Sequence, residues 1–436
     1  MFRLPIALML ALLAALPAAT PAQTAPPPAA TAPVADPALT ARANELVGLY
    51  AGTTDFDTYF APGFRAQISR AKWDGLVAQV IGQLGKPLTI ESVKPATPFA
   101  AYIRVKFERG VLNVQIAVDP AAPHNVTSLL MTAAELAGDN FEAIAGDFRK
   151  LPGTSGFGVY ALGNGAPRLV AGLNADAAAP LGSAFKLWAL GELVRSINAG
   201  ERRWGDVVPV GPPSLPSGMT QSWPAGSPVT LQTLAILMIS ISDNTATDTL
   251  VTLEGAKLDG FVAARGAPGL APMLTTRQMF AIKSAPNADL AGQWGGLGPT
   301  ARRKLLDASA ARLAATPLDI GLFSGKPVKI DTLEWFASPA QTAAMLDWLR
   351  ADTTARGVLS VNPGVDPATR AKFDYVGFKG GSEPGVITLN FLVQRKDGRW
   401  LAIAANWHRT DDAVDLNAFL QLLTRTLTVA AEAKLD

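Results

Sequence analysis

The first part of the chain places its apolar residues at two different spacings. Residues 39–50 and 73–84 carry them three or four positions apart, which predicts amphipathic helices. Three shorter runs with strand-like composition follow, at 88–93, 101–107 and 112–118. Helices followed by a run of strands predict a small α+β domain over residues 38–139, with the helices packed on one antiparallel sheet.

A second arrangement, with strands at both ends and helices between them, is predicted for residues 150–436. Strand-like runs at 156–162 and 168–173 flank Gly163-Asn164-Gly165, which is typical of a hairpin turn. Helical spacing dominates residues 184–348. A second hairpin and a last helix are predicted at 386–394, 400–407 and 415–428. This order predicts an α/β domain whose antiparallel sheet is assembled from its two ends.

The N-terminal segment has the pattern of an export signal. Arg3 precedes a short apolar run, and Thr20-Pro21-Ala22 offers a cleavage site of small residues. We therefore expect residues 1–22 to be a signal peptide, which implies a secreted or periplasmic protein. The apolar run is too short to span a bilayer, so no stable membrane span is expected in the mature form. Residues 23–37, rich in proline and alanine, are predicted to form an extended linker.

Composition narrows the possible functions. Of 436 residues, 49% are hydrophobic and 17% charged, so the chain can bury a large core. A net charge of +2 without a dominant basic run gives no reason to expect a nucleic-acid partner. The absence of cysteine excludes disulfides, a thiol nucleophile and a lipid-modified cysteine. His124 and His408 do not pair at metal-ligand spacing, so neither a metal nor another cofactor is expected.

The candidate chemistry begins at Ser183-Ala184-Phe185-Lys186. Residues three apart lie on one face of a helix, so the hydroxyl and the amine can meet. The following residues are apolar on most faces of the predicted helix, which indicates burial. Burial disfavours the charged form of a lysine, and a neutral amine can accept the proton of a serine nucleophile. Ser183 is therefore a candidate nucleophile and Lys186 its base.

The Ser-x-x-Lys pattern alone is weak evidence, because the chain contains a second copy, Ser69-Arg70-Ala71-Lys72, on a predicted solvated helix face. Two later motifs support the hypothesis. Ser242-Asp243-Asn244 offers a hydroxyl that can pass a proton to a leaving group and an amide that can hold the lysine and substrate. Lys379-Gly380-Gly381 offers a cation that can attract a substrate carboxylate. Each motif alone is also typical of something ordinary, a helix cap and a turn respectively.

Together the three motifs resemble those of class A β-lactamases and penicillin-binding proteins. The likeness extends to residues 226–231, 240–246 and 338–341, and covers roughly residues 156–427. It implies an acyl-enzyme on Ser183, with Ser242 relaying a proton and Lys379 supplying positive charge. It also implies an oxyanion hole made by the backbone N–H groups of Ser183 and Ser382, and substrate contacts at Asn244, Gly380 and Gly381. The expected partner is a small molecule with an acyl carbonyl.

One departure from class A enzymes bears on the activity. Those enzymes use a glutamate, downstream of the Ser-Asp-Asn motif, to activate the deacylating water. Here residues 260–288 contain neither Asp nor Glu, and Glu254 is expected on a helix surface. Fast class A hydrolysis of β-lactams is therefore not expected. Residues 285–329 lengthen the gap before Lys379 and are expected near the mouth of the cleft.

The whole chain is similar to two-domain serine hydrolases such as the enzyme of the clavulanic acid gene cluster and mycobacterial lipoprotein homologues. In these a ketosteroid-isomerase-like or cyclase-like domain precedes a β-lactamase-like domain. The resemblance implies an exported esterase or transacylase that acts on an ester, amide or β-lactam carbonyl. Two alternatives stay open: a true β-lactamase, and a non-catalytic sensor that binds penicillin or peptidoglycan.

Overall fold

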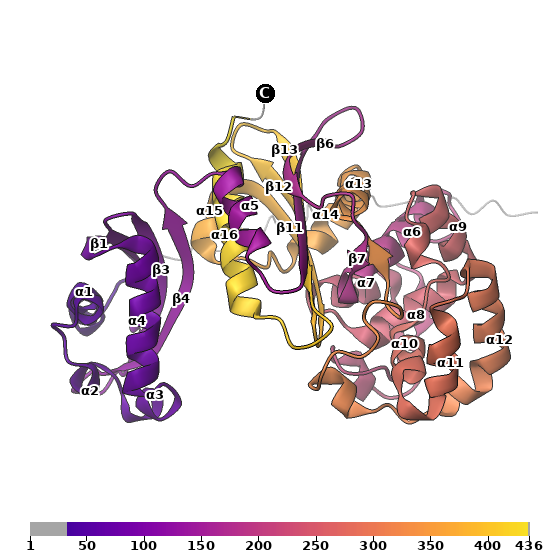
Figure 1. Cartoon of the computed structure of the whole chain (residues 1–436), viewed down its shortest axis with the longest axis horizontal. Helices are drawn as coiled ribbons and strands as arrows, with labels where there is room; N and C mark the ends of the chain where they lie inside the picture. The colour runs from indigo at the N-terminus through magenta and orange to yellow at the C-terminus, as the bar shows by residue number, and fades with distance from the viewer. Residues whose placement is uncertain (1–32, 435–436) are drawn as a thin grey trace, which may run out of the picture.

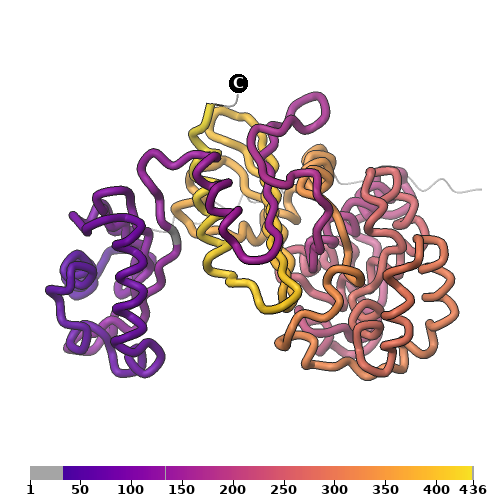
Figure 2. Tube along the Cα trace, viewed as in Figure 1, coloured from indigo at the N-terminus to yellow at the C-terminus, as the bar shows by residue number. Residues whose placement is uncertain are grey.

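The computed structural model describes residues 33–434 (Figure 1). The predicted signal peptide, 1–22, and residues 23–32 of the predicted linker lie outside the described residues. In Figure 2 the chain runs from a small N-terminal unit into a central sheet, then through a helical region, and returns to the sheet. Between residues 33 and 434 no helix combines the length and apolar character that a bilayer span requires.

The N-terminal unit packs helices on a four-stranded antiparallel sheet, as the two spacings predicted. Helices α1 (Pro37–Ala51) and α4 (Arg70–Leu84) begin at Asp36 and Ser69, whose side chains accept backbone N–H groups of the first turn. The sheet order is β1-β2-β3-β4. Its strands and the two remaining short helices are β1 (Pro87–Thr97), β2 (Ala100–Phe107), β3 (Gly110–Val118), β4 (Val126–Leu136), α2 (Phe56–Tyr59) and α3 (Pro62–Gln67).

Strand β4 was not predicted from the sequence. Its residues include several good helix formers, and it acquires its extended conformation by pairing with β3 along its length. The unit has its own apolar core, separate from those of the rest of the chain. The likeness of this unit to a ketosteroid-isomerase-like domain stays a prediction, as do the domain boundaries 38–139 and 150–436.

A five-stranded antiparallel sheet forms the centre of the molecule, in the order β11-β12-β13-β5-β6. Strands from both ends of the predicted second domain build it, which confirms the expectation from the sequence. Strand β13 pairs with β12 on one side and with β5 on the other. The strands are β5 (Thr154–Leu162), β6 (Arg168–Leu173), β11 (Phe373–Glu383), β12 (Val386–Arg395) and β13 (Trp400–His408).

Helices cover both faces of this sheet. On one face α5 (Phe141–Arg149) and α16 (Leu416–Glu432) bury an apolar core that includes Phe148 and Phe419. On the other face α13 (Pro339–Arg350) connects the sheet to the helical region. The sheet therefore lies between a two-helix layer and a helical body, and its edge strand β11 borders that body (Figure 1).

The helical region surrounds α6 (Lys186–Asn198), which follows the short 3-10 turn η1 (Gly182–Phe185). Ten residues of α6 are buried, as its apolar pattern predicted. The neighbouring elements are α7 (Leu231–Ser240), α8 (Asn244–Glu254), α9 (Ala256–Ala264), α10 (Thr276–Lys283), α11 (Ala288–Trp294), α12 (Pro299–Ala315), α14 (Thr353–Ser360), α15 (Pro367–Ala371), β7 (Ala179–Pro180), β8 (Val207–Pro209), β9 (Pro228–Thr230) and β10 (Phe336–Ala337).

The structure excludes one ordinary alternative from the sequence and corrects one prediction. Lys379-Gly380-Gly381, which alone is typical of a turn, lies inside strand β11, because the whole segment pairs with β12. Glu254 was expected on a helix surface, but it is only 4% exposed. Its carboxylate accepts a hydrogen bond from Arg202 Nε at 2.7 Å, since a buried carboxylate requires a partner.

Candidate active site

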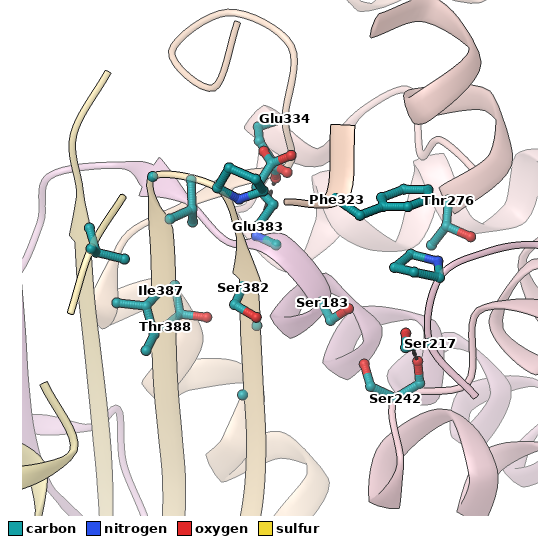
Figure 3. Close-up of a pocket in the computed structure, with 18 of the residues that line it drawn as sticks. Ser183, Ser217, Ser242, Thr276, Phe323, Glu334, Ser382, Glu383, Ile387 and Thr388 are labelled. Atoms are coloured by element: carbon teal, nitrogen blue, oxygen red, sulfur yellow. Dashed lines mark hydrogen bonds between the residues drawn. The ribbon is translucent and has the colours of Figure 1, made fainter. Parts of the chain in front are cut away.

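A cavity of about 570 Å³ lies where the edge strand β11 meets the helical region. Of the predicted site residues, it is lined by Ser183, Ser242, Asn244, Gly380, Gly381 and Ser382. In Figure 3, Ser183 and Ser382 lie in the middle of the cavity, with Ser242 and Ser217 to one side. Three motifs far apart in the sequence therefore meet at one site.

The backbone before Ser183 and the backbone of β11 approach each other closely. Gly182 has φ +50°, a conformation that favours glycine, and an added methyl group there would lie 2.8 Å from Ser382 N. A methyl group on Gly381 would lie 2.7 Å from Ser183 N and 2.1 Å from the carbonyl oxygen of Leu181. Both positions therefore require glycine. The backbone nitrogen atoms of Ser183 and Ser382 therefore both lie where these two segments meet, and both residues line the cavity.

Ser183 lies in the first turn of η1, directly before α6. Backbone N–H groups in a first helical turn have no intrahelical acceptor and remain able to bind an anion. Among the side-chain hydrogen bonds of residues 33–434, none involves Ser183 Oγ. The direct contact between this hydroxyl and the Lys186 amine that the helical spacing allows is therefore not formed in this structure.

Lys186 is fully buried beneath the cavity. Its Nζ lies 2.7 Å from Asn244 Oδ1, 2.8 Å from the carbonyl oxygen of Ser242 and 3.0 Å from Ser242 Oγ. Burial, followed by the nearby Lys379 charge, holds the pKa of Lys186 well below its usual value, although Asp248 and Asp243 oppose this shift. A lowered pKa makes the neutral amine accessible near neutral pH.

Ser242 is held between the two lysines in a left-handed backbone conformation, with φ +57°. The next residue, Asp243, explains this geometry, because its carboxylate caps α8 and also accepts the backbone N–H groups of Met219 and Thr220. Ser242 Oγ lies 3.0 Å from Lys186 Nζ and 3.1 Å from Lys379 Nζ. One hydroxyl thus connects both amines.

Lys379 is buried and does not line the cavity. It is 3% exposed, and its Nζ lies 2.7 Å from the carbonyl oxygen of Gly380 in addition to its contact with Ser242. Burial lowers the pKa of Lys379 to about 7. The Lys379 amine therefore contacts Ser242, which lines the cavity, but is not itself among the residues described as lining it.

Several acidic residues near the site were missed by the sequence reasoning. Asp248 lies beneath Thr276, whose backbone N–H and hydroxyl it accepts at 2.6 and 2.8 Å, and burial raises its pKa. Glu334 and Glu383 line the cavity itself. Residues 260–288 contain no carboxylate, as the sequence shows, but the fold brings Asp248, Glu334 and Glu383 close to the site from other parts of the chain. No local motif marks them, so only the tertiary structure could find them.

Another prediction concerned residues 285–329, which were expected at the mouth of the cleft. Phe323, Ser324 and Gly325 line the cavity, in agreement with that expectation. The second Ser-x-x-Lys copy also behaves as predicted. Ser69 is an exposed helix cap whose side chain accepts the backbone N–H of Lys72, and both residues lie on the N-terminal unit.

These features bring two buried lysines and two serine residues together at one cavity of an α/β fold. The family described as the "Beta-lactamase enzyme family" matches residues 139–320, the part of the chain that contains Ser183, Lys186 and Ser242. No curated protein matches the chain in sequence.

Solved structures with a similar course of the chain include two bacterial β-lactamases and a penicillin-binding protein. A β-lactamase from Sphaerobacter thermophilus is 20% identical, covers 67% of this chain and 97% of its own, and has a TM-score of 0.45. The structure of PBP-A is 16% identical over 66% and 94% of the two chains, with a TM-score of 0.42. A β-lactamase from Chitinophaga pinensis is 15% identical over 66% and 97%, with a TM-score of 0.46.

Proposed function

We propose that the protein is an exported serine hydrolase that forms an acyl-enzyme on Ser183. The observation that carries this proposal is that Lys186 and Lys379 both donate hydrogen bonds to Ser242 Oγ, in the cavity that Ser183 also lines. Two buried lysines with lowered pKa values are costly to maintain, and a proton-transfer site is where such an arrangement is useful. Export itself is proposed from residues 1–22.

In the proposed acylation step, Ser183 Oγ attacks the carbonyl carbon of the substrate. Neutral Lys186 accepts the serine proton, and the backbone N–H groups of Ser183 and Ser382 hold the developing oxyanion. Ser242 passes a proton to the leaving group and recovers one from the adjacent amines. Asn244, whose Nδ2 donates to the carbonyl oxygen of Leu215 at 2.7 Å, keeps Lys186 in place.

The charges around the cavity favour an ester with an uncharged acyl group as the substrate. Among the described lining residues, Glu334 and Glu383 are acidic, and no lysine or arginine contributes to the surface. A substrate carboxylate would therefore find no exposed cation among these residues. Apolar residues supply much of the remaining lining: Met279, Phe280, Phe323, Trp335, Ile387, Leu389, Val414 and Leu416. This surface suits an apolar acyl chain.

The test is intact-protein mass spectrometry over time after mixing with three reagents: a fluorophosphonate probe, a neutral nitrophenyl ester and a chromogenic cephalosporin. We expect one covalent adduct with the probe, and turnover of the ester that exceeds turnover of the cephalosporin. Ser183→Ala should abolish the adduct. Lys186→Ala should slow its formation by about 10²–10⁴-fold, because the general base is lost.

The chain supplies a matched control for both substitutions in its second Ser-x-x-Lys copy. Ser69→Ala and Lys72→Ala change the same residue types at the same spacing outside the cavity, and both should leave the labelling rate unchanged. Absence of any adduct in a folded wild-type protein would overturn the proposal.

Two rival functions have distinct outcomes in the same experiment. The family match keeps a true β-lactamase open, and rapid cephalosporin turnover without accumulation of an adduct would establish it. A non-catalytic sensor would bind penicillin or peptidoglycan fragments reversibly, with an affinity that Ser183→Ala does not change.

A further inference from the structure

Glu334 and Glu383 lie at the end of the cavity opposite Ser242 (Figure 3), and the buried Lys283 contacts both of them, so the three form one cluster. Lys283 comes from α10, Glu383 from the end of β11 and Glu334 from the segment before β10. The three side chains are 1%, 0% and 7% exposed for Lys283, Glu334 and Glu383. The proposed mechanism assigns none of them a role.

The cluster contacts both sides of the proposed oxyanion hole. Glu334 Oε2 accepts the backbone N–H of Gly182 at 3.2 Å and that of Trp335 at 2.8 Å. Gly182 directly precedes Ser183, the first proposed oxyanion donor. On the opposite side, Glu383 directly follows Ser382, the second donor, and is fixed by Lys283. One donor, Ser382, therefore directly precedes a member of the cluster, and the other, Ser183, directly follows a residue whose N–H group binds Glu334.

The charges of the cluster do not balance if both carboxyl groups are ionised. Lys283 Nζ lies 2.6 and 2.7 Å from the two oxygens of Glu383 but 4.0 Å from Glu334 Oε1. Glu334 Oε1 is buried and has no hydrogen-bond donor among the described groups. The charged side chains that face Glu334 are Glu383 and Lys283, and burial, followed by the Glu383 charge, raises the pKa of Glu334 well above its usual value.

We propose that Glu334 and Glu383 share one proton and that this carboxyl pair, neutralised by Lys283, positions the two backbone donors of the oxyanion hole. The inference rests on the proposed function, because it assumes that Ser183 and Ser382 bind the oxyanion. Glu334 is a positioning residue in this role: it acts through Gly182. When the pair is fully deprotonated, two buried carboxylates repel each other and the Gly182–Glu334 contact loosens.

The first test measures the rate at which a fluorophosphonate probe labels Ser183, as a function of pH. Glu334→Gln retains a carbonyl oxygen for Gly182 and an N–H group for Glu383, so it mimics the protonated glutamate. We expect its labelling rate at neutral pH to be within about threefold of wild type, because both contacts are kept. We expect the wild-type rate to decline at alkaline pH, where the pair loses its shared proton, and this decline should be absent in Glu334→Gln.

Glu334→Ala removes the acceptor for Gly182, and the labelling rate should fall by about tenfold or more. Complete loss of one oxyanion donor lowers the rate of acyl transfer by roughly 10²–10³-fold, so a donor that is only displaced should lower the labelling rate by no more than this. Glu254 provides a matched control, since it is another buried carboxyl with a partner but does not line the cavity. Glu254→Gln should lower stability and leave the pH profile of labelling unchanged.

An infrared difference spectrum between wild type and Glu334→Gln at neutral pH gives a readout that does not depend on activity. The carbonyl stretch of a protonated carboxylic acid should be present in the wild type and absent in the variant. If this band is missing from the wild type, or if Glu334→Gln labels as slowly as Glu334→Ala, the proposal is wrong. Wild-type protein that carries the band but is never labelled would overturn the proposed function and leave the proton-sharing pair standing.

Discussion

At the scale of single residues, the site depends on amines that burial keeps near neutrality. Lys186 and Lys379 are both buried, and each donates a hydrogen bond to Ser242 Oγ. In water both side chains would be fully protonated at neutral pH, and neither could accept a proton. The surrounding fold supplies the desolvation that changes this, with Asn244 and backbone carbonyl groups satisfying the remaining hydrogen bonds.

The labelling rate of Ser183 should therefore rise with pH. Because burial lowers the pKa of Lys379 to about 7 and holds that of Lys186 below its usual value, acid protonates both amines and removes the proposed base. The rate should be low in acid and increase as the pH passes about 7. Stopped-flow measurement with a fluorophosphonate probe tests this expectation. A rate that stays constant from acidic to mildly alkaline pH would contradict it.

At the scale of elements, strand β11 positions the site by lying directly against η1. The amine of Lys379 and the proposed backbone donor, Ser382, lie three residues apart on this strand. The hydrogen-bonded register with β12 fixes this strand from Phe373 to Glu383. The geometry of the oxyanion hole is thus a consequence of how closely one strand approaches one helical turn.

Gly381→Ala should disturb this approach. The added methyl group would lie 2.1 Å from the carbonyl oxygen of Leu181, so the strand or the turn must move. We expect destabilisation of about 1–3 kcal/mol, the usual cost of overpacking, and labelling slowed by about 10²–10³-fold as the Ser382 donor shifts. Urea unfolding and the labelling rate measure the two effects.

The matched control is Gly163→Ala, in the exposed turn between β5 and β6, where no atom lies within 4 Å of an added methyl group. It should change neither measurement. If the Gly381→Ala variant is labelled at the wild-type rate, the close contact between β11 and η1 does not matter for the chemistry.

At the scale of the whole molecule, ion pairs connect the C-terminal helix α16 with the chain that leaves the N-terminal unit. Arg425 on α16 binds Asp139 and Asp147, each at 2.7 Å, and its side chain is 11% exposed. A longer ion pair, at 3.5 Å, connects Lys372, which lies between α15 and β11, with Glu135 on strand β4. These contacts lie on the far side of the sheet from the helical region, so they bear on stability and domain arrangement and not on the proposed chemistry.

Arg425→Ala should lower the free energy of unfolding by about 3 kcal/mol, because it leaves Asp139, 7% exposed, without its counter-ion. Urea unfolding measures this loss, and labelling of Ser183 should be unaffected below the unfolding transition. Arg149→Ala is the control: its pair with Glu142 spans 3.5 Å between exposed side chains and should contribute less than about 1 kcal/mol. Equal losses in both variants would contradict the role given to Arg425.

The sequence alone determined the elements with strong local patterns. Helical spacing located α1, α4 and the buried α6, and alternating or β-branched runs located β2, β3, β5, β12 and β13. Three motifs indicated the nucleophile and its neighbours, because their chemistry is carried by residue types at short spacings. Strands β4 and β11 were not predicted, since their residues favour other conformations locally and become extended only by pairing with a neighbour.

Only the tertiary structure decided which charges surround the nucleophile. Gly182 and Glu334 are 152 residues apart, and Lys283 and Glu383 are 100 apart, yet each pair forms a hydrogen bond beside the cavity. Local periodicity carries no information about such contacts, because they depend on which faces of distant elements pack together. Burial of Glu254 and the lowered pKa values of the two lysines have the same origin. Residue identity specified the reactive groups, and packing determined their protonation and their neighbours.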